Sequence, residues 1–184
     1  MNDIVIASEA KQSMHKKILF TLIIFILGGA ALFAPSKTVL AIYNRKNPDE
    51  RVYSAQGYRN GFIISYTHSV NKGRVHDYYK CDKKEKVLIM QSTHFVSYGA
   101  GIPEPEETPG AEFTSLDDDY TISNINRTMP ALVMAVGVIA DHSFAVNKAD
   151  IEEFPLKDFF APQTSLIFEI KKVSIAGYLA HRID

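Results

Sequence analysis

The sequence predicts an all-β domain, either an antiparallel β-sandwich or a partly open barrel, preceded by one N-terminal transmembrane helix. Two observations lead to this fold class. Residues 18–34 form an apolar run without a charged side chain, and the rest of the chain consists of short apolar runs separated by turn-forming residues. No segment after the apolar run keeps a helical period over a long stretch. Many short strands with regular turn signals are typical of antiparallel sandwiches and barrels.

The apolar run Ile18–Ala34 is preceded by four basic or titratable residues: Lys11, His15, Lys16 and Lys17. Its length is at the short limit for spanning a bilayer and slightly exceeds that of a signal-peptide core. Pro35, directly after the run, disfavours signal-peptide cleavage. We therefore predict an uncleaved membrane anchor, with a cleaved signal peptide as the alternative.

This anchor divides the chain into three parts. Residues 1–17 form a cytoplasmic tail, residues 18–34 form the transmembrane anchor or an uncleaved signal-like segment, and residues 35–184 form an extracytoplasmic β-domain. The orientation follows because lysines before an anchor favour a cytoplasmic N-terminus. The predicted localisation is the cell membrane, as a single-pass protein with membrane lipid around the helix. The alternative is a secreted or periplasmic protein after cleavage.

Composition excludes several classes of partner and bond. The formal net charge is −1, and no basic stripe suggests nucleic acid, so we predict no nucleic-acid partner. Cys81 is the single cysteine, which excludes an internal disulfide. Its expected inward position is typical of a small core residue rather than a reactive thiol. We predict no cofactor.

The central stretch, Gly61–Pro103, contains three apolar-rich runs cut by turn residues. Side chains on a strand alternate between its two faces. One face of the first strand carries Phe62, Ile64, Tyr66, His68 and Val70. One face of the second strand carries Val75, Asp77, Tyr79 and Cys81. These two faces are predicted to point inward, and they carry a histidine and a carboxylate among apolar residues.

The loop between these two strands determines which residues face each other. A four-residue loop at residues 71–74 pairs Val70 with Val75 and keeps the apolar faces together, whereas a three-residue loop mixes them. The four-residue loop places His68 opposite Asp77. Because a buried carboxylate needs a partner, we predict an inward His68–Asp77 pair. The pair is either a polar contact within a small core or a ligand-binding or proton-handling site.

Other strands are expected at Thr38–Tyr43, Arg51–Ala55, Val87–Tyr98, Tyr120–Asn126, Pro130–Val138, Ser165–Lys171 and Val173–Leu179. The strand at Val87–Tyr98 has an irregular pattern, which a bulge or burial on both faces would explain. Gly99 and Gly101 follow it and permit close backbone approach. His142 lies on the apolar face of a later strand and is either a satisfied core histidine or a ligand. The candidate ligand-binding residues are therefore His68, Asp77, Tyr79, Gly99, Gly101 and His142.

Known catalytic patterns are absent from the sequence. It contains no nucleophile elbow, no Walker-type glycine loop, no H-E-x-x-H and no dinucleotide-binding glycine motif. His68 cannot readily activate Ser69, because adjacent strand residues point to opposite faces. His68, Asp77 and His142 could meet as a metal or acid–base site, but no spacing in the sequence brings them together. We therefore predict no catalytic residues, no metal site and no enzyme activity.

Three motifs in the central stretch carry a family resemblance: Y-T-H-S-V at Tyr66–Val70, V-x-D-Y-Y at Val75–Tyr79, and S-Y-G-A-G-I-P at Ser97–Pro103. Their combination resembles the family called domain of unknown function eighteen-fifty, over about Leu40–Ile170. The resemblance implies a small extracytoplasmic protein, often encoded beside TRAP transporters of the TAXI type, which take up organic acids. The family has no established activity, so the resemblance assigns no catalytic residue.

Three functional hypotheses follow. The first is a membrane-anchored accessory or interaction module of a TAXI-type TRAP uptake system, whose partners are the transporter's membrane subunit or its binding protein. The second is a small-ligand or metal-binding domain that uses the inward His68, Asp77 and His142. The third is a hydrolase-like enzyme, which the missing motifs disfavour.

Overall fold

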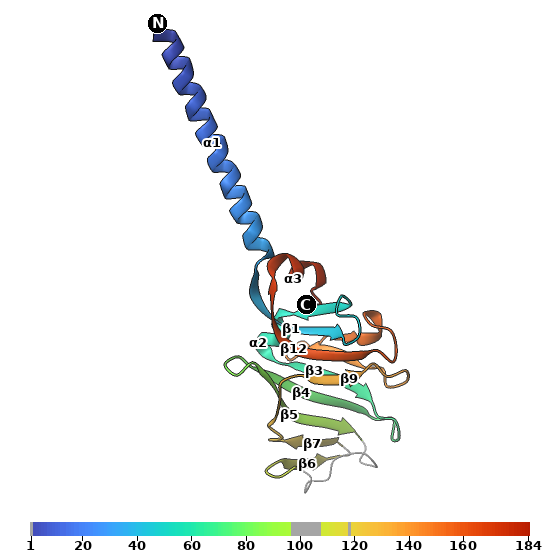
Figure 1. The fold of residues 1–184 in the computed structure, drawn as a ribbon. Coiled ribbons are helices and arrows are strands. Elements are labelled where there is room, and N and C mark those ends of the chain that lie inside the picture. Colours follow the sequence, from blue (N-terminus) through green and yellow to red (C-terminus); the bar gives the residue numbers. More distant parts are fainter. Residues whose placement is uncertain (1, 97–107, 118) are drawn as a thin grey trace. The chain divides into compact units, whose positions relative to one another are not determined.

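The computed structural model describes residues 2–96, 108–117 and 119–184, and the side chains of residues 2–15, 26 and 27 lie outside that description. The chain forms two compact units (Figure 1). The smaller comprises the chain up to Lys37 together with Val173–Ala180. The larger comprises Thr38–Lys172 together with His181–Asp184.

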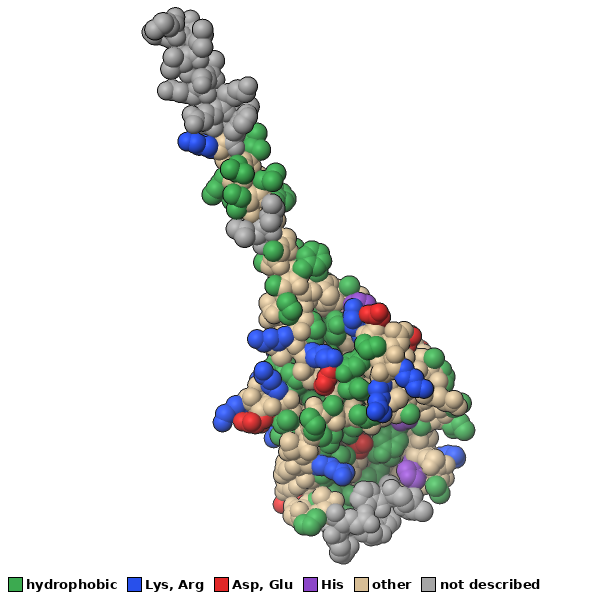
Figure 2. Space-filling view, in the orientation of Figure 1, with side chains coloured by type: hydrophobic (Ala, Val, Ile, Leu, Met, Phe, Trp, Pro, Cys, Tyr) green, Lys and Arg blue, Asp and Glu red, His purple; other side chains and the backbone are tan. Residues whose placement is uncertain are grey.

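The smaller unit contains helix α1 (Asn2–Phe33), which includes the expected anchor. Residues 2–17, expected as a tail, are helical, since this segment lacks glycine and proline and is rich in good helix formers. Within α1, the 18 residues Lys16–Phe33 have a mean hydropathy of 2.0, and none of this window is buried. Figure 2 shows apolar side chains exposed around this part of the helix. By length and composition, α1 is a candidate membrane span.

The larger unit is built from two antiparallel sheets. In spatial order, the four-stranded sheet consists of β2 (Arg51–Ser54), β1 (Pro35–Asn44), β12 (Ser165–Ser174) and β9 (Leu132–Ala135). The larger sheet consists of β11 (Glu153–Pro155), β10 (Ser143–Val146), β3 (Phe62–Thr67), β4 (Arg74–Asp82), β5 (Val87–Val96), β7 (Asp119–Ser123) and β6 (Glu112–Leu116). Its eighth strand, β8 (Arg127–Met129), pairs with β5 beside β7. A short 3-10 helix, Leu156–Asp158, follows β11.

The apolar core lies between the two sheets and confirms the predicted sandwich. Side chains from both sheets form one buried cluster: Leu40 and Ile42 of β1 and Leu166 and Phe168 of β12 on one side, and Phe62 and Ile64 of β3 and Phe144 of β10 on the other. The ring of Phe62 stacks on that of Phe168 in the opposite sheet, with centroids 6.0 Å apart. Neither sheet closes on itself among the described residues, so the domain is a sandwich and not a closed barrel.

The β3–β4 hairpin keeps the predicted faces but not the predicted register. Ile64 pairs with Asp77, and Tyr66 pairs with Val75, so the expected His68–Asp77 pair is wrong. Residues 68–73 form the loop instead. His68 accepts hydrogen bonds at Nδ1 from the backbone nitrogens of the next residues, including Val70 at 3.3 Å. The loop is therefore stabilised by its own first residue, and since the shift in register is even, each side chain stays on its predicted face.

A β-bulge in β5 explains the irregular pattern of that strand. Tyr78 pairs with Ser92, but Tyr79 pairs with Met90, so Gln91 is an extra residue on β5. The Gln91 carbonyl accepts a hydrogen bond from the backbone of Ile125 at 3.1 Å, between the segments that pair with β7 and β8. An extra residue exchanges the two faces of a strand beyond it. This bulge confirms one of the two explanations that the sequence suggested.

Two segments in which no helix was expected are helical in the structure. Residues 56–60, which follow the strand expected at Arg51–Ala55, belong to helix α2 (Ala55–Asn60), and the Gly57 amide donates to the side chain of its N-cap, Ser54, at 2.7 Å. The closing strand expected at Val173–Leu179 is also wrong, because β12 ends at Ser174 and helix α3 (Ile175–His181) follows. In both cases a serine side chain satisfies a free amide in the first helical turn, which alternation of apolar residues does not reveal.

Gly61 ends α2 and joins it to β3, and its replacement by alanine is expected to destabilise the domain. Its φ is 87°, and an added Cβ would lie 2.5 Å from the backbone oxygen of Tyr79. We expect Gly61→Ala to lower the free energy of unfolding by about 1–3 kcal/mol, through backbone strain and this clash. Chemical denaturation of the detergent-solubilised full-length chain, followed by circular dichroism, measures the change.

Gly110→Ala is a matched control for this prediction. Gly110 has the same φ of 87°, but an added Cβ would meet no atom of the described residues within 4 Å. The control therefore isolates the conformational cost and is expected to destabilise the domain less than Gly61→Ala. Equal losses for the two variants would contradict the close approach of Gly61 to Tyr79.

Candidate functional site

Asp77 is a carboxylate on the inner face of the larger sheet, between two apolar clusters. Along β4, Tyr79 on one side belongs to the main core, and Val75 on the other belongs to a second cluster with Phe95 and Ile122. Thr93 of β5 pairs with Asp77 and hydrogen-bonds its carboxylate. Alternation along β4 places Asp77 here, and the bulge in β5 turns Thr93 toward it.

The low polarity of these surroundings determines which groups are charged. Burial raises the pKa of Asp77 to about 6, although the hydrogen bond from Thr93 opposes the shift. Burial, with a further contribution from the charge of Asp77, raises the pKa of Tyr66 to about 12. The same two causes raise the pKa of Tyr79. At neutral pH the site therefore offers uncharged tyrosine hydroxyls beside a carboxyl group that titrates in the mildly acidic range.

His142 lies next to this cluster, but in the segment that precedes β10 and not within a strand as expected. Its ring centroid is 5.6 Å from that of Tyr66. Its Nδ1 accepts a hydrogen bond from the backbone nitrogen of Gly137 at 2.9 Å. Burial and the nearby charge of Arg74 lower the pKa of His142, which favours the neutral imidazole. The imidazole is thus a satisfied partner of the backbone, and Tyr66 contacts it beside Asp77.

The other sequence-based candidates do not join this cluster. His68 lies in the β3–β4 loop, where its ring organises the backbone. Gly99 and Gly101 lie outside the described residues. Within the described part of the chain, no three His, Cys, Asp or Glu side chains are grouped so that they could hold a metal ion. In the structure, Asp77 and Tyr79 therefore lie on the same face of β4, and His142 lies beside Tyr66.

The outer face of the same sheet carries a row of polar residues that the sequence did not reveal as a group. Ser143, Ser65, His76 and His94 are successive cross-strand neighbours on β10, β3, β4 and β5. Ser65 Oγ lies 2.8 Å from His76 Nδ1, and the rings of His76 and His94 stack with centroids 5.9 Å apart. At the far end, His94 Nε2 lies 2.9 Å from a carboxylate oxygen of Asp119.

An ion pair closes the other end of this polar row. Arg74 donates to Ser143 Oγ at 2.7 Å and to Glu153 Oε2 at 2.8 Å, and Ser143 itself donates to Glu153 at 2.6 Å. Burial raises the pKa of Glu153, but the hydrogen bonds from Ser143 and Arg74 outweigh it, so the net pKa is lowered. Arg74 and Glu153 are 79 positions apart. Alternation along β4 is the one local hint of this row, because it places Arg74 and His76 on the face opposite Asp77.

One comparison with known proteins identifies the segment that carries the inner cluster and most of the polar row. Residues 62–152 match the family model described as Domain of unknown function (DUF1850). This part of the chain belongs to the DUF1850 family. The matched segment is shorter than the expected range of about 40–170. No curated protein and no solved structure matches the chain.

The DUF1850 segment begins at the first residue of β3 and ends one residue before β11. It therefore contains the whole inner cluster of Tyr66, Asp77, Tyr79, Thr93 and His142. It stops short of Glu153 and contains only β9 of the four-stranded sheet. The inner cluster is accordingly the part of the candidate site that belongs wholly to the family segment.

The serine–histidine contact in the DUF1850 segment does not have the geometry of a nucleophile and its base. Glu153 Oε1 lies 3.8 Å from His76 Nδ1, the same nitrogen that Ser65 contacts. In a catalytic triad, the serine and the carboxylate contact opposite nitrogens of the imidazole. Ser65 is also 1% exposed, which leaves little room for a substrate carbonyl. The polar row is therefore better suited to holding strands together and to contacting a partner.

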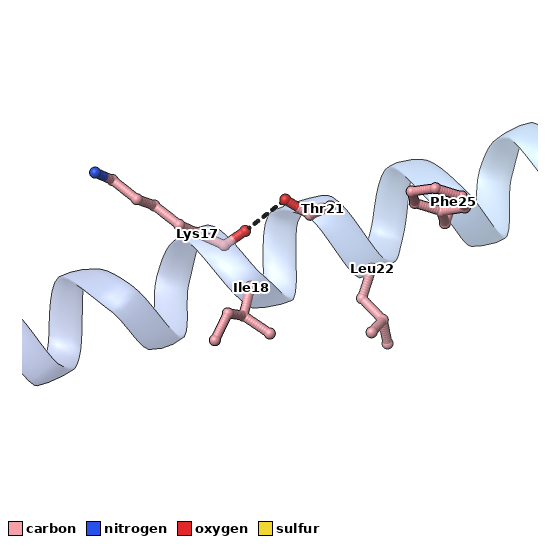
Figure 3. Close-up of a pocket in the computed structure, with 5 residues that line it drawn as sticks. All are labelled: Lys17, Ile18, Thr21, Leu22 and Phe25. Carbon is pink, nitrogen blue, oxygen red and sulfur yellow. Dashed lines mark hydrogen bonds between the residues drawn. The ribbon is translucent and has the colours of Figure 1, made fainter.

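A hollow outside the DUF1850 segment lies along α1 and is lined by Lys17, Ile18, Thr21, Leu22 and Phe25 (Figure 3). All of these residues belong to one helix, and Thr21 Oγ1 donates to the carbonyl of Lys17 one turn earlier, at 3.0 Å. Such a hollow is the space between side chains of a single helix. It is more suitable for contact with lipid or another helix than for enclosing a small ligand.

Proposed function

We propose that the chain is a membrane-anchored extracytoplasmic module that binds a partner and does not catalyse a reaction. The main support for a membrane anchor is the exposed apolar window Lys16–Phe33. Its 18 residues form a helix about 27 Å long, close to the roughly 30 Å thickness of a bilayer's hydrocarbon core. Apolar side chains exposed on all sides of a helix are stabilised by lipid, whereas in water they favour aggregation.

The charges beside this window support an orientation with the N-terminus in the cytoplasm. Lys16 and Lys17 stand at its start, and lysines accumulate on the cytoplasmic side of membrane spans. Residues 35–184 then face the outside. Cys81 is compatible with an oxidising compartment, because burial raises the pKa of its thiol to about 12 and so suppresses the reactive thiolate.

The proposed role of the outer domain is that of an accessory module in solute uptake. Its family resemblance implies a TAXI-type TRAP transporter as the neighbouring system, with the membrane subunit or the binding protein as partner. The polar row supports a binding role, since its half-buried histidines and paired charges suit a polar protein interface. The single nitrogen shared by Ser65 and Glu153 on His76 supports a non-enzymatic role.

Charged residues in the middle of α1 are expected to release the protein from the membrane. An arginine at the centre of a span costs about 2.5–3.5 kcal/mol, so Leu22→Arg combined with Ile24→Arg costs about 5–7 kcal/mol. We expect this variant to leave the carbonate-resistant membrane fraction, while Leu22→Ile combined with Ile24→Leu stays in it. Protease added to intact spheroplasts should digest the β-domain of the parent protein. Retention of the double-arginine variant, or protection of the β-domain, contradicts the proposed anchoring or orientation.

The proposed identity of the partner is tested by crosslinking the full-length chain in its native membrane and identifying the crosslinked proteins. A TRAP membrane subunit or solute-binding protein should be recovered, and His94→Ala should reduce that recovery more than Lys148→Ala. Both residues are surface-accessible, but only His94 belongs to the polar row. Recovery of neither transporter component would overturn the uptake role.

A second candidate function, binding of a small hydrogen-bonding ligand, is favoured by the raised pKa of Asp77 beside Tyr66 and Tyr79. Perturbed carboxyl groups in apolar surroundings are common at binding sites. A solute that co-purifies with the parent protein should be lost from Asp77→Asn and kept by Asp141→Asn, whose carboxyl lies outside this cluster. Equal retention by both variants would exclude the inner cluster as the binding site.

A further inference from the structure

A second hollow, of about 490 Å³, lies on the β-domain and is strongly basic. It is lined by Thr38, Tyr58, Lys83, Lys86, Ile170, Lys171 and Lys172, called here the lysine groove. These residues come from β1, α2, the β4–β5 turn and β12, so side chains from distant segments of the chain, four of them lysines, line one groove. None of the seven residues that line the groove is a carboxylate.

The positive charge of the lysine groove is only partly compensated. Lys171 forms an ion pair with Glu169 at 2.6 Å and lies over the ring of Tyr43. Lys83 lies over the ring of Tyr58, 5.9 Å from its centroid. Lys86 and Lys172 form no ion pair with any residue that the structure describes. Like charges that converge in a hollow repel one another and attract an anion.

The chemistry of the lysine groove suits a phosphate group attached to an apolar body. Lysine ammonium groups bind phosphate as point charges without a fixed geometry. Ile170 and the ring of Tyr58 add an apolar wall, which free inorganic phosphate would not use. The combination matches an anionic phospholipid, in which a charged phosphodiester is joined to a glycerol and acyl chains.

The covalent chain connects the lysine groove to the proposed anchor. Thr38 lines the groove and follows Phe33, the last residue of α1, by five residues. Five extended residues reach at most about 18 Å, so the chain keeps Thr38 within that distance of the end of the apolar helix. Basic groups that come near an anionic membrane surface are attracted to it. We infer that the lysine groove binds the phosphate of an anionic membrane lipid, an inference that rests on the proposed membrane anchoring.

Amine acylation of the full-length chain in lipid nanodiscs tests this inference. A bound phosphate slows the reaction of the ammonium groups that contact it, and mass spectrometry measures each lysine separately. We expect Lys83, Lys86 and Lys172 to react several-fold more slowly in discs that contain phosphatidylglycerol than in discs of phosphatidylcholine alone. Lys46 and Lys148, exposed elsewhere on the β-domain, should react equally in both. Added salt should remove the difference.

Two variants and one soluble probe complete the test. Lys86→Glu combined with Lys172→Glu should remove the protection of Lys83 by anionic lipid, since each lysine near the surface contributes about fivefold to lipid affinity. Lys46→Glu combined with Lys148→Glu has the same charge change and should leave the protection intact. Glycerol phosphate added to phosphatidylcholine discs should protect weakly.

Each outcome has a defined meaning. Equal acylation in the two kinds of disc, or full protection in the Lys86/Lys172 variant, overturns the lipid site. Full protection by glycerol phosphate without anionic lipid overturns the assignment to a membrane lipid. Failure of the proposed anchoring is distinguishable, because the chain would then not be incorporated into the discs at all.

Discussion

Phe62→Ala is expected to lower the free energy of unfolding by about 3–5 kcal/mol, which is a large fraction of the stability of a small domain. Phe62 is completely buried and lies where the two sheets meet. Its ring stacks on Tyr79 with centroids 4.9 Å apart, and on Phe144 and Phe168 at 6.0 Å each. Alanine would remove these contacts from both sheets at once and leave a cavity that close-packed strands cannot fill.

The loss is measured by chemical denaturation of the full-length chain in detergent, followed by near-ultraviolet circular dichroism of tyrosine. Every tyrosine lies after residue 37, so the signal reports on the chain beyond α1. Phe62→Leu keeps more of the volume and should cost less than Phe62→Ala, which gives a measurable value if the alanine variant does not fold.

Phe113→Ala is the matched control for Phe62→Ala. Phe113 is 36% exposed on the edge strand β6, so its truncation should cost about 1 kcal/mol or less. A cost for Phe62→Ala similar to that for Phe113→Ala would contradict the packing of the two sheets through Phe62.

Asp77→Asn is expected to stabilise the domain at pH 7.5, by up to about 3 kcal/mol. Burial raises the pKa of Asp77 from its ordinary 3.8 to about 6, and a difference of about two pKa units corresponds to about 3 kcal/mol. The folded state binds the proton of Asp77 more tightly than the unfolded state does. Protonated Asp77 therefore contributes its full stabilisation to the parent protein below pH 4. This stabilisation is lost as the pH rises through 6, where the buried carboxylate becomes charged.

The difference in unfolding free energy between Asp77→Asn and the parent protein should depend on pH. That dependence shows whether the Asp77 carboxyl group causes the difference. The two proteins should have similar unfolding free energies near pH 4. Between pH 4 and pH 7, the variant should become more stable than the parent protein. The other titratable groups are common to both proteins, so their contributions cancel in the comparison.

Asp141→Asn is expected to have the opposite sign. A hydrogen bond and ion pair with Lys157 lower the pKa of Asp141, so its carboxylate stabilises the fold at neutral pH and this contribution is lost as the pH falls. The effect should be small because Asp141 is exposed to solvent. A loss of stability in Asp77→Asn at pH 7.5 would show that its carboxylate has a compensating partner in the folded protein.

The central hairpin shows why faces are easier to predict than register. Phe62, Ile64 and Tyr66 do share the inner face with Asp77 and Tyr79, because alternation is a property of each strand alone. The partner of each residue depends on the loop, and His68 lengthens that loop through hydrogen bonds to backbone amides. The predicted His68–Asp77 pair failed for this reason, while the prediction that Asp77 points inward was correct.

The sequence by itself determined the elements that depend on local composition: the apolar helix, the strand-rich domain, the inward faces of β3 and β4, and the motifs of the DUF1850 family. These follow from hydrophobicity and period, which neighbouring residues establish together. Only the tertiary structure decided which side chains meet across strands. The bulge at Gln91 turned Thr93 toward Asp77, and pairing of strands far apart in the chain joined Arg74 to Glu153 and gathered the lysine groove. Such contacts depend on register and long-range pairing, which no local pattern encodes.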